Sequence, residues 1–554
     1  MYLTRGTAPE TETKMNNSDQ RQLTVRSLVL GVIGSVIITM SSMYIALRLS
    51  SLPWPIIFVA LASMFSLKLM GNTNLNEINV THTAMSAGAM VSGGLAFTIP
   101  GIWIMMPEEK PSFPVILAIS MGGTILGLIF TVFIRKYFVE EKKLEYPMGQ
   151  AAADTLRAGD EGGQKAKTLF TALGITGAFT IFRDWLHKIP AAWMSKKAAA
   201  YGSSAGIWFS PMMIGVGFLL GPSLIFIWFL GAVLGDFGIL FLGVKGGFLT
   251  TPEAVSLKAS LGIGMMVGCG LGIIIKGILP KLKDIFTASF SAQGGNDIAL
   301  RPSLTGVIVI AIAAIFATVC NMGFGASVIT IVGAWLAVSM SSESVGTTGV
   351  NPMEIFGMLV MLCARAITSV GSVESFYVAA VVAVAAGLVG DVMNDFKVGY
   401  SFGTSPKDQW IAEAVGGMAG AVSAAAALMA VYTAYGPEAI GGPEFPAAQA
   451  AAVASMVSGI SNLPAFIVGI VAATVLYCMG LPVMTLGLGV YLPAYLSLTA
   501  SLGGLIRFFV DRRGKKVPES KAVEKGTLIA SGCLGGEAVV GVVISIILAI
   551  QTIR

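Results

Sequence analysis

Long apolar stretches alternate with short polar loops along the chain from Val25 to Ile550. The stretches are about 17–25 residues long, the length that an α-helix needs to cross a hydrocarbon layer about 30 Å thick. Such helices satisfy every backbone polar group without water. At about 20 residues per span, the chain has room for roughly 14–16 spans. The pattern therefore predicts an all-α polytopic membrane protein.

Two series of predicted spans open the two halves of the chain. The first comprises residues 25–47, 53–70, 80–104 and 114–134, and the second comprises residues 303–322, 326–341, 353–370 and 375–391. Basic residues flank the first series, and loops rich in Lys and Arg stay in the cytoplasm. We therefore expect a multi-pass protein of the cell (inner) membrane with a cytoplasmic N terminus. A basic loop containing Lys397 and Lys407 is predicted after the second series.

Short motifs recur in the same order in the two halves. The pairs are Gly71–Ile78 with Gly346–Ile355, Pro147–Asp154 with Pro406–Glu413, and Phe209–Gly221 with Tyr491–Gly503. Because both halves begin on the same side, they predict two parallel pseudo-repeats at residues 23–300 and 301–554, after a polar cytoplasmic tail at 1–22. The basic segments Arg183–Lys197 and Arg512–Lys525 cannot both be cytoplasmic with about eight simple crossings per half. Broken or re-entrant segments near 144–165 and 447–480 are therefore expected.

Composition supports a membrane protein and narrows its chemistry. Of the 554 residues, 55% are hydrophobic and 12% are charged, whereas roughly 25% are charged in a soluble domain. There is no Walker loop, no GxSxG and no HExxH motif, and His82 and His187 are the two histidines. The five cysteines lie in apolar runs and are interpreted as packing residues. We therefore expect no enzyme activity, no cofactor and no metal site, and any work must come from an ion gradient.

Polar residues within or beside the spans are the candidates for function, because they are costly in lipid. The stretch Asn72–His82 opens a Gly/Ser/Ala-rich run. It predicts either an unwound helix that lines a cavity or a polar loop that leads into a closely packed helix. Because Asn, Thr and Gly form helices poorly, we expect this stretch and Gly346–Glu354 to be non-helical or broken near the central cavity. Arg365 lies in an otherwise apolar run, where it can pair with Glu354 or grip a substrate carboxylate. The candidate substrate-binding residues are Asn76, Glu77, Asn79, His82, Asn351, Arg365 and Tyr491.

Carboxylates are the second group of candidates. Gln150 and Asp154 share a helix face at i,i+4, as do Gln409 and Glu413. Such pairs can hold a cation or a substrate amine, but they also suit cytoplasmic helix starts, where acids are favoured. A carboxylate that is kept from water can take up a proton near neutral pH. The candidates for proton coupling are Glu77, Glu374 and Glu537.

Several sequence blocks together resemble a known family. They are GNTNLNEI, FTIPGIW, LEYPMGQAAA, DVMNDFKVGYSFGTSPKDQ and GLGVYLPAYLSLTASLGGLIR. Their order from about residue 22 to 550 resembles the oligopeptide transporter (OPT) superfamily, in particular its prokaryotic branch, which is related to the yellow-stripe-like metal-chelate transporters. The resemblance implies a proton-coupled importer of small peptides, glutathione-like compounds or metal complexes of amino-acid-derived chelators. The Asn-Pro-Gly signature of the peptide branch is not evident in this chain.

The expected function is secondary active transport, as proton-coupled symport of short peptides or metal-chelate complexes. A passive channel or pore is an alternative, although it would favour rings of repeated charge. An intramembrane transferase is a second alternative, and the scarcity of His argues against it. The expected partners are the substrate, protons and the lipid bilayer, with a homodimer as a candidate assembly and no nucleic acid.

Overall fold

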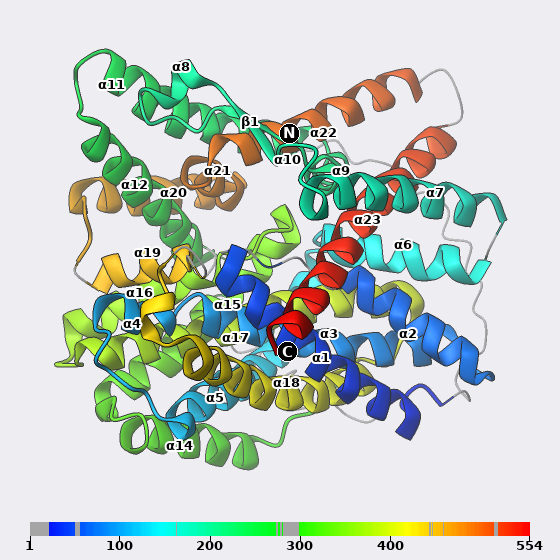
Figure 1. The fold of residues 1–554 in the computed structure, drawn as a ribbon, viewed down its shortest axis with the longest axis horizontal. Helices are drawn as coiled ribbons and strands as arrows, with labels where there is room; N and C mark the ends of the chain where they lie inside the picture. The colour runs from blue at the N-terminus through cyan, green and yellow to red at the C-terminus, as the bar shows by residue number, and fades with distance from the viewer. Residues whose placement is uncertain are drawn as a thin grey trace.

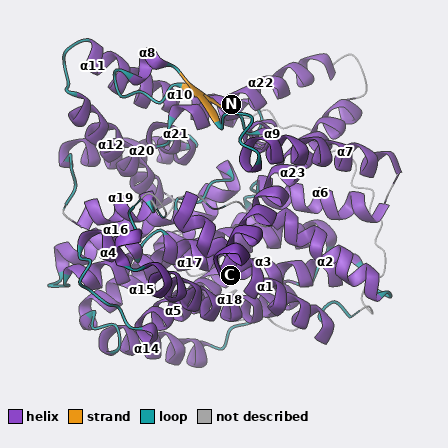
Figure 2. Ribbon diagram, viewed as in Figure 1, coloured by secondary structure: helices purple, strands orange, loops and turns teal. Residues whose placement is uncertain are grey.

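The computed structural model describes residues 21–49, 52, 56–161, 163–272, 275–276, 280, 298–442, 445, 447–457, 459–514 and 519–553. Helices make up almost all of its regular structure (Figure 2). Within these residues the strands are β1 (Ala192–Met194) and β2 (Gly206–Trp208), which form one antiparallel pair in which Trp193 is opposite Ile207. The all-α prediction is confirmed.

The predicted spans coincide with helices at the start of each half of the chain. The first series forms α1 (Val25–Leu49), α2 (Ile56–Met70), α3 (Leu75–Ala96), α4 (Pro100–Met105) and α5 (Phe113–Arg135). The second series forms α14 (Pro302–Thr318), α15 (Gly323–Thr348), α16 (Met353–Ile367) and α17 (Ser372–Phe402). Helix α18 (Pro406–Tyr435) follows almost directly. The predicted basic loop was wrong, because Lys397 lies inside α17 and Lys407 in the first turn of α18.

Eight helical segments of the described residues are long and apolar enough to cross a membrane. They include α1, α5, α15, α17 and α18. Four shorter apolar helices accompany them, namely α2, α9 (Pro211–Leu220), α14 and α20 (Leu463–Cys478). The fold is therefore that of a polytopic membrane protein, and the total of 14–16 spans stays a prediction.

The helices form two groups, which we call the first and second lobes (Figure 1). The first lobe contains α1–α5, η1 (Lys136–Glu141), α14–α18, η6 (Pro437–Ala439) and α19 (Ala448–Val457). The second lobe contains the strand pair, α8 (Lys196–Ala199), α9, α10 (Pro222–Ala232), η3 (Val233–Leu242), α11 (Gly243–Lys245), α12 (Thr251–Gly272), α20, α21 (Val483–Tyr491) and α22 (Ala494–Gly514). On one side of the molecule lie α6 (Pro147–Glu161), α7 (Gly163–Thr180), η2 (Ile181–Trp185) and α23 (Glu519–Ile553), and α23 packs against helices of both lobes.

Each lobe combines helices from both halves of the sequence. In the first lobe, α3 packs against α17 and α18, and in the second lobe α12 packs against α20 and α21. The predicted repeats at residues 23–300 and 301–554 therefore interleave in space, and their superposition stays a prediction. Short helices instead of single spans occupy the segments near 144–165 and 447–480, as expected for broken elements.

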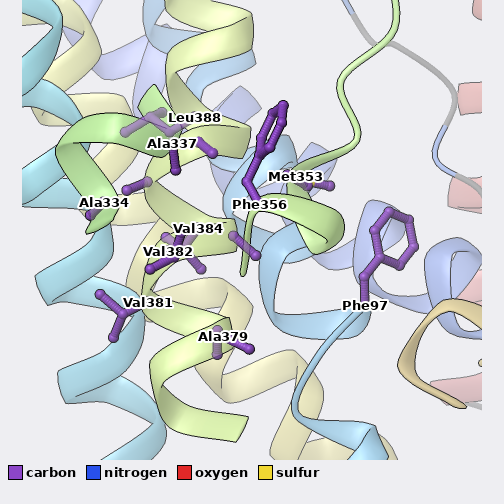
Figure 3. Close-up of a cluster of buried hydrophobic side chains, with 14 of the residues drawn as sticks. Phe97, Ala334, Ala337, Met353, Phe356, Ala379, Val381, Val382, Val384 and Leu388 are labelled. Atoms are coloured by element: carbon purple, nitrogen blue, oxygen red, sulfur yellow. The ribbon is translucent and has the colours of Figure 1, made fainter. Parts of the chain in front are cut away.

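Small residues let the helices of the first lobe approach closely, as is common between membrane helices. A Cβ at Gly416 of α18 would lie 2.0 Å from the Ala84 carbonyl oxygen of α3, and one at Gly420 would lie 2.2 Å from the Gly88 Cα. Figure 3 shows Val381, Val384 and other side chains of α17 in the buried cluster, and Val384 lies against Gly123 of α5. Helix α17 is buried over almost its whole length, so it forms the centre of this lobe.

Backbone breaks occur in one of the two segments where unwinding is predicted. Between α15 and α16 the helix stops at Gly349, which has φ 71°, and resumes at Met353. In the other segment only the start is irregular: Asn72 has φ 47°, and the Asn74 side chain caps α3. Residues 75–82 are helical, so the expected unwinding there was wrong. The cap and the buried partners of these polar side chains stabilise the helix instead.

Candidate functional site

Four buried ionisable side chains meet where α3, α17 and α18 pack together. They are His82, Asp391, Asp395 and Glu413, each of which is at most 1% exposed, and we call them the acidic cluster. Asp391 and Asp395 are four residues apart on α17 and therefore share one face of that helix. His82 is carried by α3, and Glu413 by α18.

Asp395 is at the centre of the acidic cluster. Its Oδ1 lies 3.5 Å from His82 Nε2, and its Oδ2 accepts a hydrogen bond from Ser86 Oγ at 2.7 Å. The charge of Asp395 acts on both Asp391 and Glu413. Among the residues that the structure describes, none donates a hydrogen bond of good geometry to the carboxylates of Asp391 and Glu413.

This arrangement cannot hold three free negative charges. Carboxylates that face each other in a site without water repel strongly, and one imidazole balances at most one of them. A proton bound within the acidic cluster therefore relieves this repulsion. Within the described ranges, no three acid, His or Cys side chains are placed to hold a metal ion. The arrangement is chemically suited to binding and releasing protons.

A chain of hydrogen bonds leads from the acidic cluster to the first turn of α3. His82 Nδ1 lies 3.4 Å from Asn79 Oδ1, and Asn79 Nδ2 donates to Thr404 Oγ1 at 3.1 Å. The Thr404 hydroxyl donates to Asn76 Oδ1 at 2.8 Å. Of the predicted substrate-binding residues, His82 thus belongs to the acidic cluster, and Asn76 and Asn79 lie beside it. They line a packed helix interface, since Asn76 is only 6% exposed.

The predicted acid–amide pairs take different forms. On α6, Gln150 Nε2 donates to Asp154 Oδ1 at 3.0 Å. On α18, Gln409 Nε2 instead donates to the Asp395 backbone oxygen at 2.8 Å, which leaves Glu413 to face the acids of α17. The i,i+4 spacing therefore gives an acid–amide hydrogen bond on α6 but not on α18.

The three acids predicted for proton coupling lie elsewhere. Glu77 binds Arg26 through both oxygens, at 2.7 and 2.6 Å. Glu537 accepts hydrogen bonds from Arg183, Ser210 and the Met212 amide, each at 2.9 Å. Glu374 is partly exposed in the first turn of α17. Sequence reasoning missed Asp391 and Asp395. Their i,i+4 spacing at the end of an apolar run was the signal that could have revealed them.

Of the remaining predicted residues, Asn351 and Glu354 lie at the break between α15 and α16. Asn351 Nδ2 donates to the Ala386 backbone oxygen of α17 at 3.0 Å, and Asn351 Oδ1 accepts from Ser341 at 3.0 Å. Glu354 is 7% exposed. Arg365 is exposed near the other end of α16. The predicted ion pair of Arg365 with Glu354 was wrong, because eleven helical residues separate the two along the axis by about 16 Å.

The ion pair of Arg183 and Glu537 yields a stability prediction. Both side chains are at most 6% exposed. We expect Arg183→Met to lower the free energy of unfolding by about 3–5 kcal/mol, because it leaves a buried carboxylate without its cation. The double variant Arg183→Met/Glu537→Gln should recover part of this loss. Thermal unfolding of the purified variants checks this order of stability, in which the double variant lies between the wild type and Arg183→Met. Equal melting temperatures for the wild type and Arg183→Met would contradict it.

Comparison with known proteins places this architecture in a family. A polytopic helical fold with ionisable groups buried in its spans defines a membrane protein of the transport class. The family model described as "OPT oligopeptide transporter protein" matches residues 22–282 and 297–548. The chain therefore belongs to the OPT oligopeptide transporter family.

Individual relatives cover most of the chain. A protein of Haemophilus influenzae named "Putative oligopeptide transporter" is 25% identical over 92% of each chain. A rice protein named "Probable metal-nicotianamine transporter YSL11" is 22% identical over 94% of this chain and 86% of its own length. A second rice protein, "Probable metal-nicotianamine transporter YSL9", is 24% identical over 61% of this chain and 55% of its own length.

Proposed function

We propose that this protein is a secondary active transporter that couples proton movement to the uptake of short peptides or metal-chelate complexes. The observation that carries this proposal is the acidic cluster, which is buried among the helices of the first lobe. Membership of the OPT family supports transport, and the names of the relatives support these two substrate classes. The protein would act in the cell membrane with its N terminus in the cytoplasm, as a monomer or a homodimer.

In this proposal the acidic cluster is the coupling site, in place of Glu77, Glu374 and Glu537. A proton that binds there removes charge repulsion between α17 and α18. Protonation therefore favours one arrangement of the packed helices over another, as any ligand does that binds two states unequally. Glu77 and Glu537 are already neutralised by Arg26 and Arg183, so we assign them to the stability of the fold.

Uptake into proteoliposomes tests the proposed function. The panel comprises dialanine, glutathione and nickel–nicotianamine, each with and without an inward proton gradient. We expect at least one solute to accumulate only with the gradient and to be released when a protonophore is added. Equal flux with and without the gradient would instead indicate a passive pore, and the absence of flux for all three solutes would contradict both substrate classes.

A further inference from the structure

The two lobes meet near the start of α16. There, α15 and α16 of the first lobe contact α12 and α21 of the second lobe. Glu354 lies in the first turn of α16. Tyr491 is the last residue of α21, and the charge of Glu354 acts on it. A buried carboxylate thus lies near the opposite lobe, where α16 begins and α21 ends.

Glu354 has no ion-pair partner among the described residues, unlike three other buried glutamates. Glu77, Glu343 and Glu537 have the cationic partners Arg26, Lys142 and Arg183. Glu354 is 7% exposed, and its carboxylate has a hydrogen-bond contact only with its own backbone amide among the described residues. A buried carboxylate without a counter-charge is costly, and such a group in a membrane protein marks a pathway or a binding site.

Among the described residues of the second lobe, Lys258 lies beside Tyr491, and it is not a free positive charge. Lys258 of α12 donates to the backbone oxygen of Leu492, the neighbour of Tyr491, at 3.3 Å. However, Lys258 is 8% exposed and forms an ion pair with Asp236. Asp236 also accepts hydrogen bonds from the Ser204 amide at 2.7 Å and the Ser204 hydroxyl at 2.8 Å. Lys258 and Asp236 therefore neutralise each other, whereas Glu354 has no ion-pair partner among the described residues.

The backbone break holds Glu354 in place. Asn351, three residues earlier, is tied to Ser341 of α15 and to the Ala386 backbone of α17. The Val350 carbonyl accepts a hydrogen bond from Ser344 at 2.7 Å. The polar groups of the break thus form hydrogen bonds within the first lobe. The Glu354 carboxylate has no partner side chain among the described residues and is therefore available to a ligand. A site that is already ordered loses little entropy when a ligand binds.

We propose that Glu354 binds a cationic group of the transported solute, such as the free ammonium group of a peptide or of a chelator. The inference rests on the proposed function and adds a specificity-determining residue to it. The aromatic ring of Tyr491, on the opposite lobe, suits a cation as a second contact. Because the two groups belong to different lobes, a bound cation would bridge the lobes.

Equilibrium binding in lipid nanodiscs tests this inference with matched probes. The probes are dialanine and N-acetyl-dialanine, which differ in the ammonium charge, together with nickel–nicotianamine. Calorimetry should show that the wild type binds dialanine about 10–100-fold more tightly than its acetylated form, as expected for a hydrogen bond to a charged group. Glu354→Gln should abolish this preference, and Glu354→Asp should retain part of it.

Control measurements separate the inference from the proposed function. Glu438→Gln, an exposed acid of the loop after α18, should bind all three probes as the wild type does. Size-exclusion chromatography and thermal unfolding establish that each variant is folded. An undiminished preference in Glu354→Gln, or none in the wild type, would overturn the inference alone. Amine-dependent binding without gradient-driven uptake would overturn only the proposed coupling, and no binding of any probe would overturn both.

Discussion

Asp395→Asn is expected to abolish accumulation driven by a proton gradient while leaving substrate exchange intact. The substitution keeps the shape of the side chain at the centre of the acidic cluster but removes its negative charge, and with it the repulsion that a bound proton relieves. For one proton per substrate, a gradient of one pH unit drives accumulation of about tenfold. In the variant this ratio should fall to about one. Uptake and counterflow of the same labelled solute in proteoliposomes measure the two properties separately.

Glu374→Gln is the matched control for this prediction. Glu374 lies on the same helix as Asp395, but it is partly exposed in the first turn and far from the acidic cluster. We expect this variant to accumulate substrate as the wild type does. Normal accumulation by Asp395→Asn, or loss of accumulation by Glu374→Gln alone, would show that the coupling site lies outside the acidic cluster.

Gly416→Val is expected to prevent normal packing of the first lobe. The Cβ that it adds would meet the Ala84 carbonyl oxygen at 2.0 Å, and a backbone atom in a helix cannot move aside as a flexible side chain can. Overpacking of a core typically costs about 1–3 kcal/mol, and here the contact also separates α3 from α18. We expect a large loss of monodisperse protein and a lowered melting temperature of the remainder.

Gly306→Val provides the comparison for this packing effect. Gly306 lies on α14, and an added Cβ there would have no neighbouring atom within 4 Å. The same change in helix propensity is therefore made without a steric conflict. Similar yields and melting temperatures for both valine variants would contradict the assigned role of the close contact between α3 and α18.

The positions of most helices follow from the sequence, because each long apolar stretch must satisfy its backbone internally in lipid. Hydropathy was less reliable where polar residues lie within a helix. The apolar run ending near residue 391 predicted a loop at Lys397, yet α17 continues to Phe402. Likewise, the polar stretch before His82 predicted an unwound segment, yet it is helical from Leu75. In both places, distant parts of the chain satisfy the polar side chains: Lys397 donates to the Leu144 backbone oxygen, and Asn79 donates to Thr404.

The sequence by itself determined that this is a helical membrane protein of the OPT family, since hydropathy and ordered sequence blocks depend only on the chain. Only the tertiary structure decided which acids lie together. Asp391 and Asp395 on α17 and Glu413 on α18 belong to the second half, and His82 belongs to the first. The close packing of α3, α17 and α18 brings these residues together. Glu354, on α16, is buried and has no ion-pair partner among the described residues. Whether a buried charge is neutralised depends on distances across helix interfaces, and the order of residues along the chain does not specify those distances.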